Sequence, residues 1–335
     1  MMHNLPGTES IRPALMSMVG KGKTSAITSH QSPDGDGHAA ALALQCFLLH
    51  GGFIADIVTD ADDLSRFEFL GARGRVVSHA MGMHYDTVIV LDCNSLDRLG
   101  KREALITQAQ AVAVIDHHVQ EHHPIPAAFS FIEPAYVSAG AILYRALQDE
   151  MAAMPEEDRL FMANCFWITL LNDTNNFINA NTDAHVFETA KDLMAYGIKP
   201  HILYKEFFQN HSANEMRFVG ETLSTIRLYH NDKLLVMHST LAMQEANGID
   251  AEAIMSVTRW VQGTSGLIAI VYICEKKPGI WKLSLRSQTL NVQAIAAKYG
   301  GGGHMKASGC TIKGDLKGVE AQILQDFKAA ITSNV

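Results

Sequence analysis

The chain has 335 residues, 47% of them apolar and 19% charged, with a formal net charge of −8 at pH 7. This length and composition predict a globular protein with two domains, and no apolar run is long enough to cross a membrane. The negative charge, with no block rich in Lys or Arg, argues against a long nucleic-acid duplex as partner. It favours a small anionic substrate held by metal ions.

Cysteine usage and the N-terminus predict a cytoplasmic protein. The five cysteines are scattered, odd in number and without CxxC spacing, which favours a reducing compartment over a disulfide framework or a zinc ribbon. The first 23 residues contain no compact apolar segment followed by a small-residue cleavage site, so export is not expected.

The first part of the chain alternates short apolar runs with amphipathic stretches, the pattern of strands joined by helices. The expected strands cover residues 25–30, 53–59, 87–92 and 111–116. The expected helices cover residues 39–50, 138–150 and 159–171. Two of the strand segments, TVIVLD and AVAVID, are continuously apolar up to a final aspartate, as in strands covered on both faces. Residues 1–190 are therefore predicted to form a domain around a parallel sheet.

The rest of the chain predicts a helical connector and a second domain. The connector covers residues 191–229, with a break at Gly197–Pro200 written GIKP. Beyond it, residues 230–335 are predicted to form a smaller α/β domain. Its expected strands cover residues 233–239, 265–274 and 279–287, with one helix at 249–261 and another at the C-terminus. The predicted fold class is α/β throughout.

Acidic and histidine-bearing segments stand where the apolar runs of the first domain end. The four segments are residues 30–36 (HQSPDGD), Asp92, residues 116–118 (DHH) and Asp173. Because the carboxyl ends of parallel strands meet at one edge of a sheet, we expect these side chains to converge. Together they offer carboxylate and imidazole without thiolate, a set that suits Mn²⁺ and similar divalent ions and is large enough for two of them.

This convergence favours hydrolysis of a phosphoester. Asp34 and Asp36 lie two residues apart in an expected Pro/Gly loop, where metal ions would have to reverse the local charge before a phosphate could bind. Two ions can activate water and stabilise the leaving oxygen. Each residue alone has a simpler interpretation as a turn, a strand cap or a surface histidine. Their order and their common position at element ends favour the metal centre.

The same segments resemble the four signature motifs of the DHH phosphoesterase superfamily, whose third motif is DHH. Residues 300–309 (GGGGHMKASG) resemble the GGGH hallmark of the DHH-associated C-terminal domain, so the resemblance covers nearly the whole chain. The length and two-domain plan are similar to those of bacterial nanoRNases, the group of bifunctional oligoribonucleases and pAp phosphatases.

The resemblance implies a centre of two Mn²⁺ ions. One ion would be bound by His30, Asp34 and Asp92. Asp92 would also bridge to the other ion, whose remaining ligands are Asp36, His117 and Asp173. The resemblance further implies that His118 faces the substrate phosphate and that Asp116 orients an imidazole.

Two segments depart from the family pattern. Residues 37–40 read GHAA where a small residue and Gly-Ser are common, and residues 172–175 read NDTN where TDTG is usual. No implied ligand is lost, so the departures concern the fit of the substrate rather than the chemistry. His122 and His123 could add ligands, but a solvated loop is the favoured interpretation.

The second domain is predicted to bind the substrate. Four consecutive glycines, Gly300–Gly303, carry a large conformational entropy cost, so we expect their backbone to approach a partner closely, with N–H groups of Gly301, Gly302 and Gly303 available to an anion. Strand alternation places Arg286 on a polar face, where its guanidinium suits a phosphate. The resemblance also points to Arg286 and implies that His304 stacks on a base.

The predicted function is hydrolysis of short oligonucleotides to mononucleotides, or of pAp to AMP, with Mn²⁺ as cofactor. One alternative with the same chemistry is hydrolysis of cyclic or linear dinucleotides such as c-di-AMP and pApA. An alternative of another class is a nucleotide sensor without catalysis, against which the complete ligand set argues. The apolar connector helices are compatible with a homodimer, and core packing explains them equally well.

Overall fold

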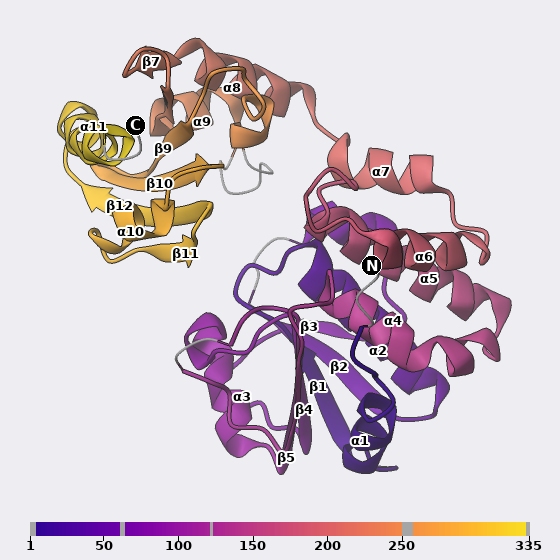
Figure 1. Cartoon of the computed structure of the whole chain (residues 1–335). Helices are drawn as coiled ribbons and strands as arrows, with labels where there is room; N and C mark the ends of the chain where they lie inside the picture. Colours follow the sequence, from indigo (N-terminus) through magenta and orange to yellow (C-terminus); the bar gives the residue numbers. More distant parts are fainter. Residues whose placement is uncertain (1–4, 61–63, 121–122, 250–256, 333–335) are drawn as a thin grey trace. The chain divides into compact units, whose positions relative to one another are not determined.

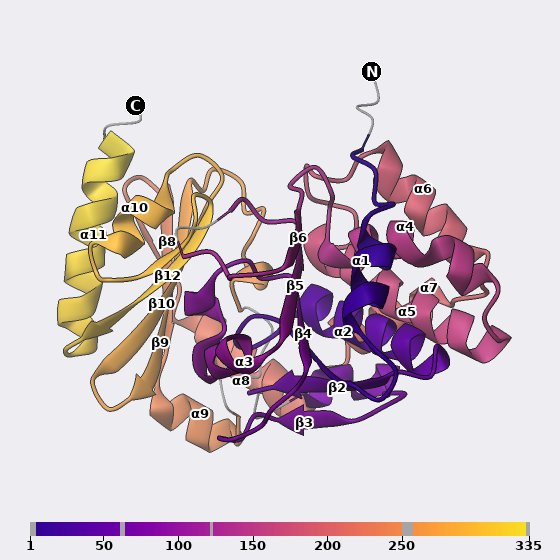
Figure 2. The same ribbon diagram turned by 90° about the horizontal axis from the view of Figure 1, so that it is seen from below.

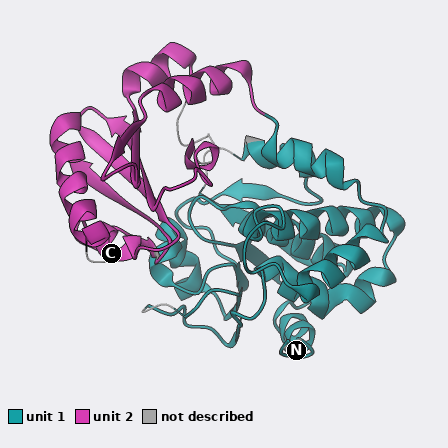
Figure 3. Cartoon of the chain, turned by 45° about the horizontal axis from the view of Figure 1, so that its top comes forward, with its two compact units in different colours: residues 1–210 teal, residues 211–335 magenta. Residues whose placement is uncertain are grey.

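A computed structural model describes residues 5–60, 64–120, 123–249 and 257–332 (Figure 1). The chain divides into two compact units, Met1–Asn210 and His211–Val335, which are described separately (Figure 3). Each unit contains a six-stranded sheet with helices packed on it, and the sheet of the first unit is parallel. The predicted fold class, α/β with a parallel sheet at the N-terminal end, helices in the middle and a second sheet, is confirmed.

The first sheet has the strand order β3-β2-β1-β4-β5-β6, and every neighbouring pair is parallel. Its strands are β1 (Thr24–Thr28), β2 (Ile54–Thr59), β3 (Val76–Ser78), β4 (Thr87–Leu91), β5 (Ala111–Asp116) and β6 (Phe129–Ile132). The four predicted strands are confirmed. The edge strands β3 and β6 were not predicted, because they are short and mostly half-exposed and so carry little apolar pattern. The chain leaves β1 toward β2 and later returns to β4 on the other side, which places a topological switch point between β1 and β4.

Helices cover both faces of this sheet, as Figure 2 shows with the strands seen nearly edge-on. On one face lie α2 (Gly35–His50), α4 (Ala139–Ala152) and α5 (Glu156–Asp173), which pack on one another. On the other face, α3 (Glu103–Gln108) packs against the strands through Leu105 and Ile106. The remaining helices are α1 (Ile11–Met18), α6 (Ala184–Met194) and α7 (Pro200–Phe208).

The helix predicted over residues 39–50 begins earlier, at Gly35. Asp34 caps it, because its Oδ1 accepts hydrogen bonds from the backbone N–H groups of Asp36 and Gly37. Asp36 therefore lies in the first turn of α2 and not in a loop, which corrects the prediction for this residue. Nearly every residue of α2 is buried, so its Ala- and Leu-rich sequence lacks a polar face that would mark where the helix starts.

The second unit contains a mixed sheet with the order β11-β12-β10-β9-β8-β7. Its strands are β7 (Arg227–Tyr229), β8 (Leu234–Ser239), β9 (Ala269–Lys277), β10 (Ile280–Ser287), β11 (Gly302–His304) and β12 (Ala307–Lys313). The strand predicted over residues 265–274 starts four residues later, because Gly263 and Gly266 have φ angles of +83° and +84° and form turns. The glycine-rich segment over residues 300–309, for which no strand was predicted, contains β11 and the start of β12.

Both faces of the second sheet are covered. In β8, Leu234 and Val236 pack toward α10 (Val292–Ala297) and α11 (Leu316–Thr332). Leu235 and Met237 point to the opposite face, where α8 (Ala213–Ser224) packs and α9 (Leu241–Asn247) borders the sheet. Of the helix predicted over residues 249–261, residues 250–256 lie outside the described part, and Val257–Trp260 form a short 3₁₀ helix. None of the described helices is long and apolar enough to cross a membrane.

Candidate metal centre

The structure brings the predicted ligands together at the carboxyl edge of the first sheet. His30 follows β1, Asp92 directly follows β4, Asp116 is the last residue of β5, and Asp173 is the last residue of α5. Among the described residues, three groups have donor atoms within 4.8 Å of one another: His30, Asp34 and Asp92; Asp36, His117 and Asp173; and Asp92, Asp116, His117 and His118. This clustering at the switch point is the convergence that the strand-end positions predict.

Asp92 joins these groups. Its Oδ2 lies 3.4 Å from His30 Nε2, whereas its Oδ1 lies 3.4 Å from His117 Nε2 and 3.3 Å from His118 Nδ1. The residue is buried, with 1% of its surface exposed. Its φ of 56° lies in the left-handed region, which aspartate tolerates better than most residues and which turns the chain sharply at the end of β4. Among the described residues, Asp92 is therefore the carboxylate that belongs to two of these ligand groups.

Asp36 is held by the N-terminus of α4. Its carboxylate accepts hydrogen bonds from Ala139 N (2.7 Å) and Gly140 N (3.0 Å), the first two N–H groups of that helix. His117 Nε2 lies 3.8 Å from Asp36 Oδ2 and 3.6 Å from Asp173 Oδ2. A fully buried carboxylate is thus fixed by an element more than 100 residues away.

Asn172 connects Asp34 with Asp173. Its Nδ2 donates to Asp34 Oδ2 at 3.0 Å and to Asp173 Oδ1 at 2.9 Å, and its Oδ1 accepts from Gly35 N. In the sequence, Asn172 stands out only as a departure from a motif, and its positioning role was not predicted. The only signal of this role in the sequence was that Asn172 is adjacent to the predicted ligand Asp173. Its other partner, Asp34, lies in a different motif.

Asp116 orients the two histidines that follow it. Its Oδ1 accepts hydrogen bonds from the backbone N–H groups of His117 (2.8 Å) and His118 (3.2 Å) and lies 2.9 Å from His118 Nδ1. Burial would raise the pKa of Asp116, but the interaction with His118 lowers it overall, so the carboxylate is ionised. The geometry places Asp116 against His118 Nδ1 rather than among the groups around His30.

The electrostatics of the cluster fit a divalent cation. Burial and neighbouring carboxylates raise the pKa of Asp36 and Asp173 well above the usual range. Burial lowers the pKa of the histidines, but nearby carboxylates outweigh it and raise His30 to about 10 and His117 to about 9. Four buried side-chain atoms of the cluster have no hydrogen-bond partner among the described residues: Asp92 Oδ1, Asp116 Oδ2, His117 Nε2 and Asp173 Oδ2. Since a metal ion would ligate these atoms and neutralise the carboxylates, the residues fit the group that the sequence predicts.

Among the histidines outside the motifs, His123 and His38 contact residues that are not part of the cluster. His123 Nδ1 lies 2.6 Å from Asp97 Oδ2 in an exposed pair, and His122 lies outside the described residues. His38, one of the departures from the family pattern, is 5% exposed and stacks on Phe67 with ring centroids 4.8 Å apart. Burial, assisted by Arg66, lowers the pKa of His38 to about 4, so it packs as a neutral ring.

The predicted substrate residues of the second unit lie at one end of its sheet. Arg286 is half-buried on β10 and donates from Nη1 to the carbonyl of Leu285, while Gly302, Gly303 and His304 form β11. The N–H of Gly301 already donates to the carbonyl of Ala296 at the end of α10, so it is engaged within the fold. Gly302 and Gly303 pair with Gly309 and Ser308 of β12, so this part of the glycine run is also engaged within the sheet.

Gly301 also has a packing role that the sequence did not indicate. A Cβ at this position would lie 2.2 Å from the carbonyl oxygen of Gly309 in β12, whereas a Cβ at Gly302 would meet nothing within 4 Å. The close approach predicted for the glycine run is therefore, at Gly301, an approach to β12.

We expect Gly301→Ala to lower the free energy of unfolding by about 1–3 kcal/mol, because the methyl group would push two strands apart. Gly302→Ala is the matched control and should change it by less than about 1 kcal/mol. Chemical denaturation of both variants measures the difference, and equal destabilisation would contradict the packing role.

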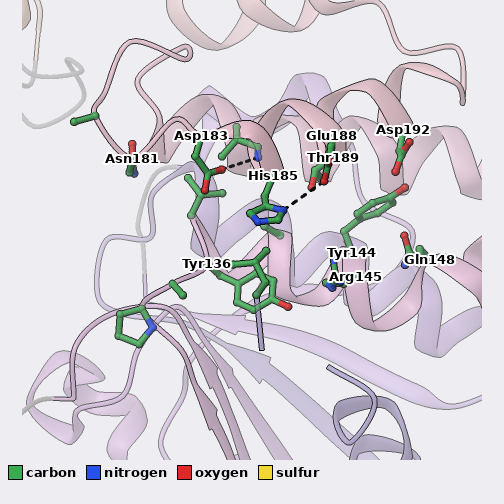
Figure 4. A pocket seen from close by; sticks show the side chains of 17 residues that line it. Tyr136, Tyr144, Arg145, Gln148, Asn181, Asp183, His185, Glu188, Thr189 and Asp192 are labelled. Carbon is green, nitrogen blue, oxygen red and sulfur yellow. Dashed lines mark hydrogen bonds and ion pairs between the residues drawn. The ribbon is translucent and has the colours of Figure 1, made fainter. Parts of the chain in front are cut away.

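A separate cavity of about 290 Å³ lies between α4 and α6 in the first unit (Figure 4). Its described lining includes Tyr136, Tyr144, Arg145 and His185, and none of the predicted site residues is among the residues that line it. Asn181 at its edge donates to the backbone carbonyl of Asp173. The cavity is therefore a neighbour of the cluster and not part of it.

A parallel sheet with an acidic and histidine-bearing cluster at its switch point, followed by a mixed-sheet unit, defines a two-unit α/β protein with a candidate metal centre. Residues 24–168 match the model described as the DHH family, N-terminal domain, and residues 236–333 match the DHHA1 domain. The chain therefore contains a DHH domain followed by a DHHA1 domain, and the resemblance stated from the sequence is confirmed.

Individual relatives agree with this assignment. The chain is 26% identical over 313 residues to the bifunctional oligoribonuclease and PAP phosphatase NrnA of Thermus thermophilus, covering 91% of this chain and 90% of the relative. It is 24% identical to the cyclic-di-AMP phosphodiesterase GdpP of Geobacillus thermodenitrificans over 94% of this chain and 49% of that protein. The structure of an exopolyphosphatase-related protein from Bacteroides fragilis is similar in fold, with a TM-score of 0.81, 19% identity, and coverage of 93% of this chain and 92% of that one.

Proposed function

We propose that the protein is a metal-dependent phosphoesterase that hydrolyses short oligonucleotides to mononucleotides, pAp to AMP, or both. The observation that carries this proposal is the cluster at the switch point, where buried carboxylate and imidazole atoms without hydrogen-bond partners face one another. Such an arrangement is electrostatically unfavourable without a cation and suits phosphoryl transfer with one. Five unpaired, buried cysteines support the further proposal of a cytoplasmic location.

The proposed centre contains two divalent ions, with Mn²⁺ favoured by the carboxylate and imidazole ligands. His30, Asp34 and Asp92 would hold one ion. Asp36, Asp92, His117 and Asp173 would hold the other, with Asp92 shared. When bound, the ions would polarise the phosphoryl group and lower the pKa of a water molecule.

The protein side chains would position the substrate. Asp116 lies against His118 Nδ1 and orients the ring, and the His118 imidazole would face a phosphate oxygen of the substrate. The reaction would break the bond between phosphorus and the ester oxygen, the oxygen of water would stay on phosphorus, and a proton from that water would end on the departing oxygen, which leaves as a hydroxyl group. His118 and Asp116 are therefore proposed as the catalytic pair beside the metal ligands.

The second unit would supply the nucleotide contacts. Arg286 forms no ion pair with any carboxylate among the described residues, and burial lowers its pKa, so a phosphate is a favourable partner for its guanidinium. Gly302, Gly303 and His304 would contact the same nucleotide, and Gly301 would support them by packing. The relatives named as oligoribonucleases and PAP phosphatases favour short oligonucleotides and pAp as substrates. A homodimer remains a prediction.

A second candidate is hydrolysis of a dinucleotide messenger. The similarity to a cyclic-di-AMP phosphodiesterase over 94% of this chain favours it, and the proposed chemistry at phosphorus is the same. A nucleotide sensor without catalysis is less favoured, because every ligand position in the cluster carries a carboxylate or an imidazole.

A substrate panel tests the proposal. Di- to pentanucleotides, pAp, pApA and cyclic di-AMP are incubated with one preparation of the full-length protein and Mn²⁺, and initial rates are compared. Highest rates on short oligonucleotides or pAp are expected. Highest rates on cyclic di-AMP or pApA would favour the second candidate, and no hydrolysis of any substrate would contradict the proposal.

Arg286→Lys is expected to raise KM for pAp about 10-fold with kcat within about 2-fold, because lysine retains the charge but not the two-pronged contact to phosphate. Arg227→Lys makes the same change at a residue of β7 whose side chain is 66% exposed, and it should leave both constants unchanged. Steady-state kinetics of the two variants measure the effect. A fall in kcat without a change in KM would contradict the binding role.

A further inference from the structure

A fully buried arginine, Arg102, contacts the chain segment that leads to His30 of the candidate metal centre. Arg102 is the last residue of a 3₁₀ turn, Gly100–Arg102, and its side chain is 0% exposed. Its Nη2 lies 2.9 Å from Asp60 Oδ1, just beyond the end of β2. Burying a guanidinium is unfavourable even when it is paired, and an apolar side chain of similar volume would often stabilise a core better. Packing alone therefore does not explain why a charged arginine occupies position 102.

The contacts of Arg102 lead to the residue before His30. Its Nη1 donates to the carbonyl of Ser29 at 2.8 Å and to Thr28 Oγ1 at 2.6 Å. Thr28 Oγ1 in turn donates to the carbonyl of Val58 in β2 at 2.8 Å. The peptide that joins Ser29 to His30 is thus held by a buried charge at the point where β1 ends.

The peptide on the other side of His30 is held by the same segment of chain. Gln31 N donates to the carbonyl of Arg98 at 2.8 Å, in the 3₁₀ turn Leu96–Arg98. The backbone on both sides of His30 is thus fixed by residues 98–102, which follow shortly after Asp92. The His30 ring, whose Nδ1 lies 2.8 Å from the carbonyl of Gln31, directs Nε2 toward Asp92 Oδ2.

We propose that Arg102, paired with Asp60, is a positioning residue that fixes the His30 imidazole for binding a divalent ion together with Asp34 and Asp92. This inference rests on the proposed metal centre. Arg102 does not touch the cluster itself; it acts through the Ser29 carbonyl. A purely structural role is the competing explanation, because the same contacts also tie β1 to β2.

Metal binding by the full-length protein separates these roles. The protein is stripped of metal, and Mn²⁺ binding is followed by the electron paramagnetic resonance signal of free Mn²⁺, with thermal unfolding recorded in parallel. Arg102→Met is expected to weaken binding at one site about 10- to 100-fold, the usual effect of losing a residue that orients a metal ligand. Arg102→Lys should recover part of this loss, and Asp60→Asn should show a smaller loss of the same kind.

A double-mutant cycle with His30→Asn makes the test specific. If Arg102 acts through His30, adding Arg102→Met to His30→Asn should change Mn²⁺ affinity by less than about 2-fold. Leu105→Ala, at a buried apolar residue of α3, is the control that lowers the melting temperature and should leave Mn²⁺ affinity unchanged. If Arg102→Met does not fold, Arg102→Lys and Asp60→Asn are each combined with His30→Asn in the same double-mutant cycle.

Two results would overturn the inference: wild-type Mn²⁺ affinity in the Arg102 variants, or an equal loss of affinity with and without His30. If the wild-type protein binds Mn²⁺ normally, either result contradicts the role of Arg102 and does not contradict the proposed function. Failure of the wild-type protein itself to bind Mn²⁺ would instead contradict the proposed metal centre.

Discussion

Asp92→Asn is expected to reduce hydrolysis of short oligonucleotides by at least about 1,000-fold, equivalent to about 4 kcal/mol of activation free energy. The substitution keeps the shape of the side chain and removes the charge that faces His30, His117 and His118 at 3.3–3.4 Å. Because Asp92 is the proposed bridge, both ions would lose a ligand. Initial rates with saturating Mn²⁺, together with the number of Mn²⁺ ions bound per chain, measure the effect.

Asp97→Asn is the matched control. It makes the same chemical change five residues further on, at a side chain that is 69% exposed and pairs only with His123 among the described contacts. We expect wild-type turnover and metal content from this variant. Retention of more than about a tenth of wild-type turnover by Asp92→Asn would contradict the bridging role.

Removal of divalent metal is expected to abolish activity and to lower the melting temperature. Without a cation, the buried Asp36 and the partly buried Asp173 lie beside other carboxylates, and this burial and repulsion raise the pKa of each. A ligand that binds only the folded state stabilises it by about 2.7 kcal/mol at a concentration 100 times its Kd. The melting temperature of the chelator-treated protein should therefore rise as Mn²⁺ is added, and activity should return with it.

The Asp92→Asn protein supplies the control for this experiment. With a ligand missing from both proposed sites, its melting temperature should respond much less to Mn²⁺. A similar response in both proteins would mean that Mn²⁺ stabilises the fold at another place. Activity of the wild-type protein that survives exhaustive chelation would contradict a metal-dependent reaction.

Much of the candidate site was predictable because it depends on local signals. The strands ending at Asp92 and Asp116 are continuous apolar runs that stop at a carboxylate, and parallel strands bring such ends to one edge. His30 and Asp34 follow another strand by a few residues. Backbone direction alone therefore predicts that these side chains converge, without knowledge of any contact.

The positioning residues were not predictable in the same way. Asn172 joins two motifs that are 138 residues apart, and Arg102 reaches the carbonyl of Ser29 across 73 residues of chain. The N-terminus of α4 holds Asp36 through backbone N–H groups, which leave no mark in the amino-acid sequence beyond the cap at Ser138. Such contacts depend on how helices pack against the sheet, and one sequence does not specify that packing.

The glycine run shows the same limit. Its composition indicated a backbone that approaches something closely, but the sequence could not say what it approaches. The structure places Gly301 against Gly309 of β12 and uses its N–H to end α10. This local pairing of two short strands has no periodic apolar signal, since β11 consists of two glycines and a histidine.

Apolar patterning and functional-group type were enough to predict the α/β class, the strand ends that carry the acids and histidines, and the chemical character of the ligands. Three features became visible only in the folded chain: Asp92 lies between His30 and His117, Asp36 contacts the start of α4, and the buried Arg102 contacts the carbonyl of the residue before His30. The difference arises from distance along the chain. Residue type and period are local properties, whereas the geometry of a metal centre is set by long-range packing of elements that meet only in the folded protein.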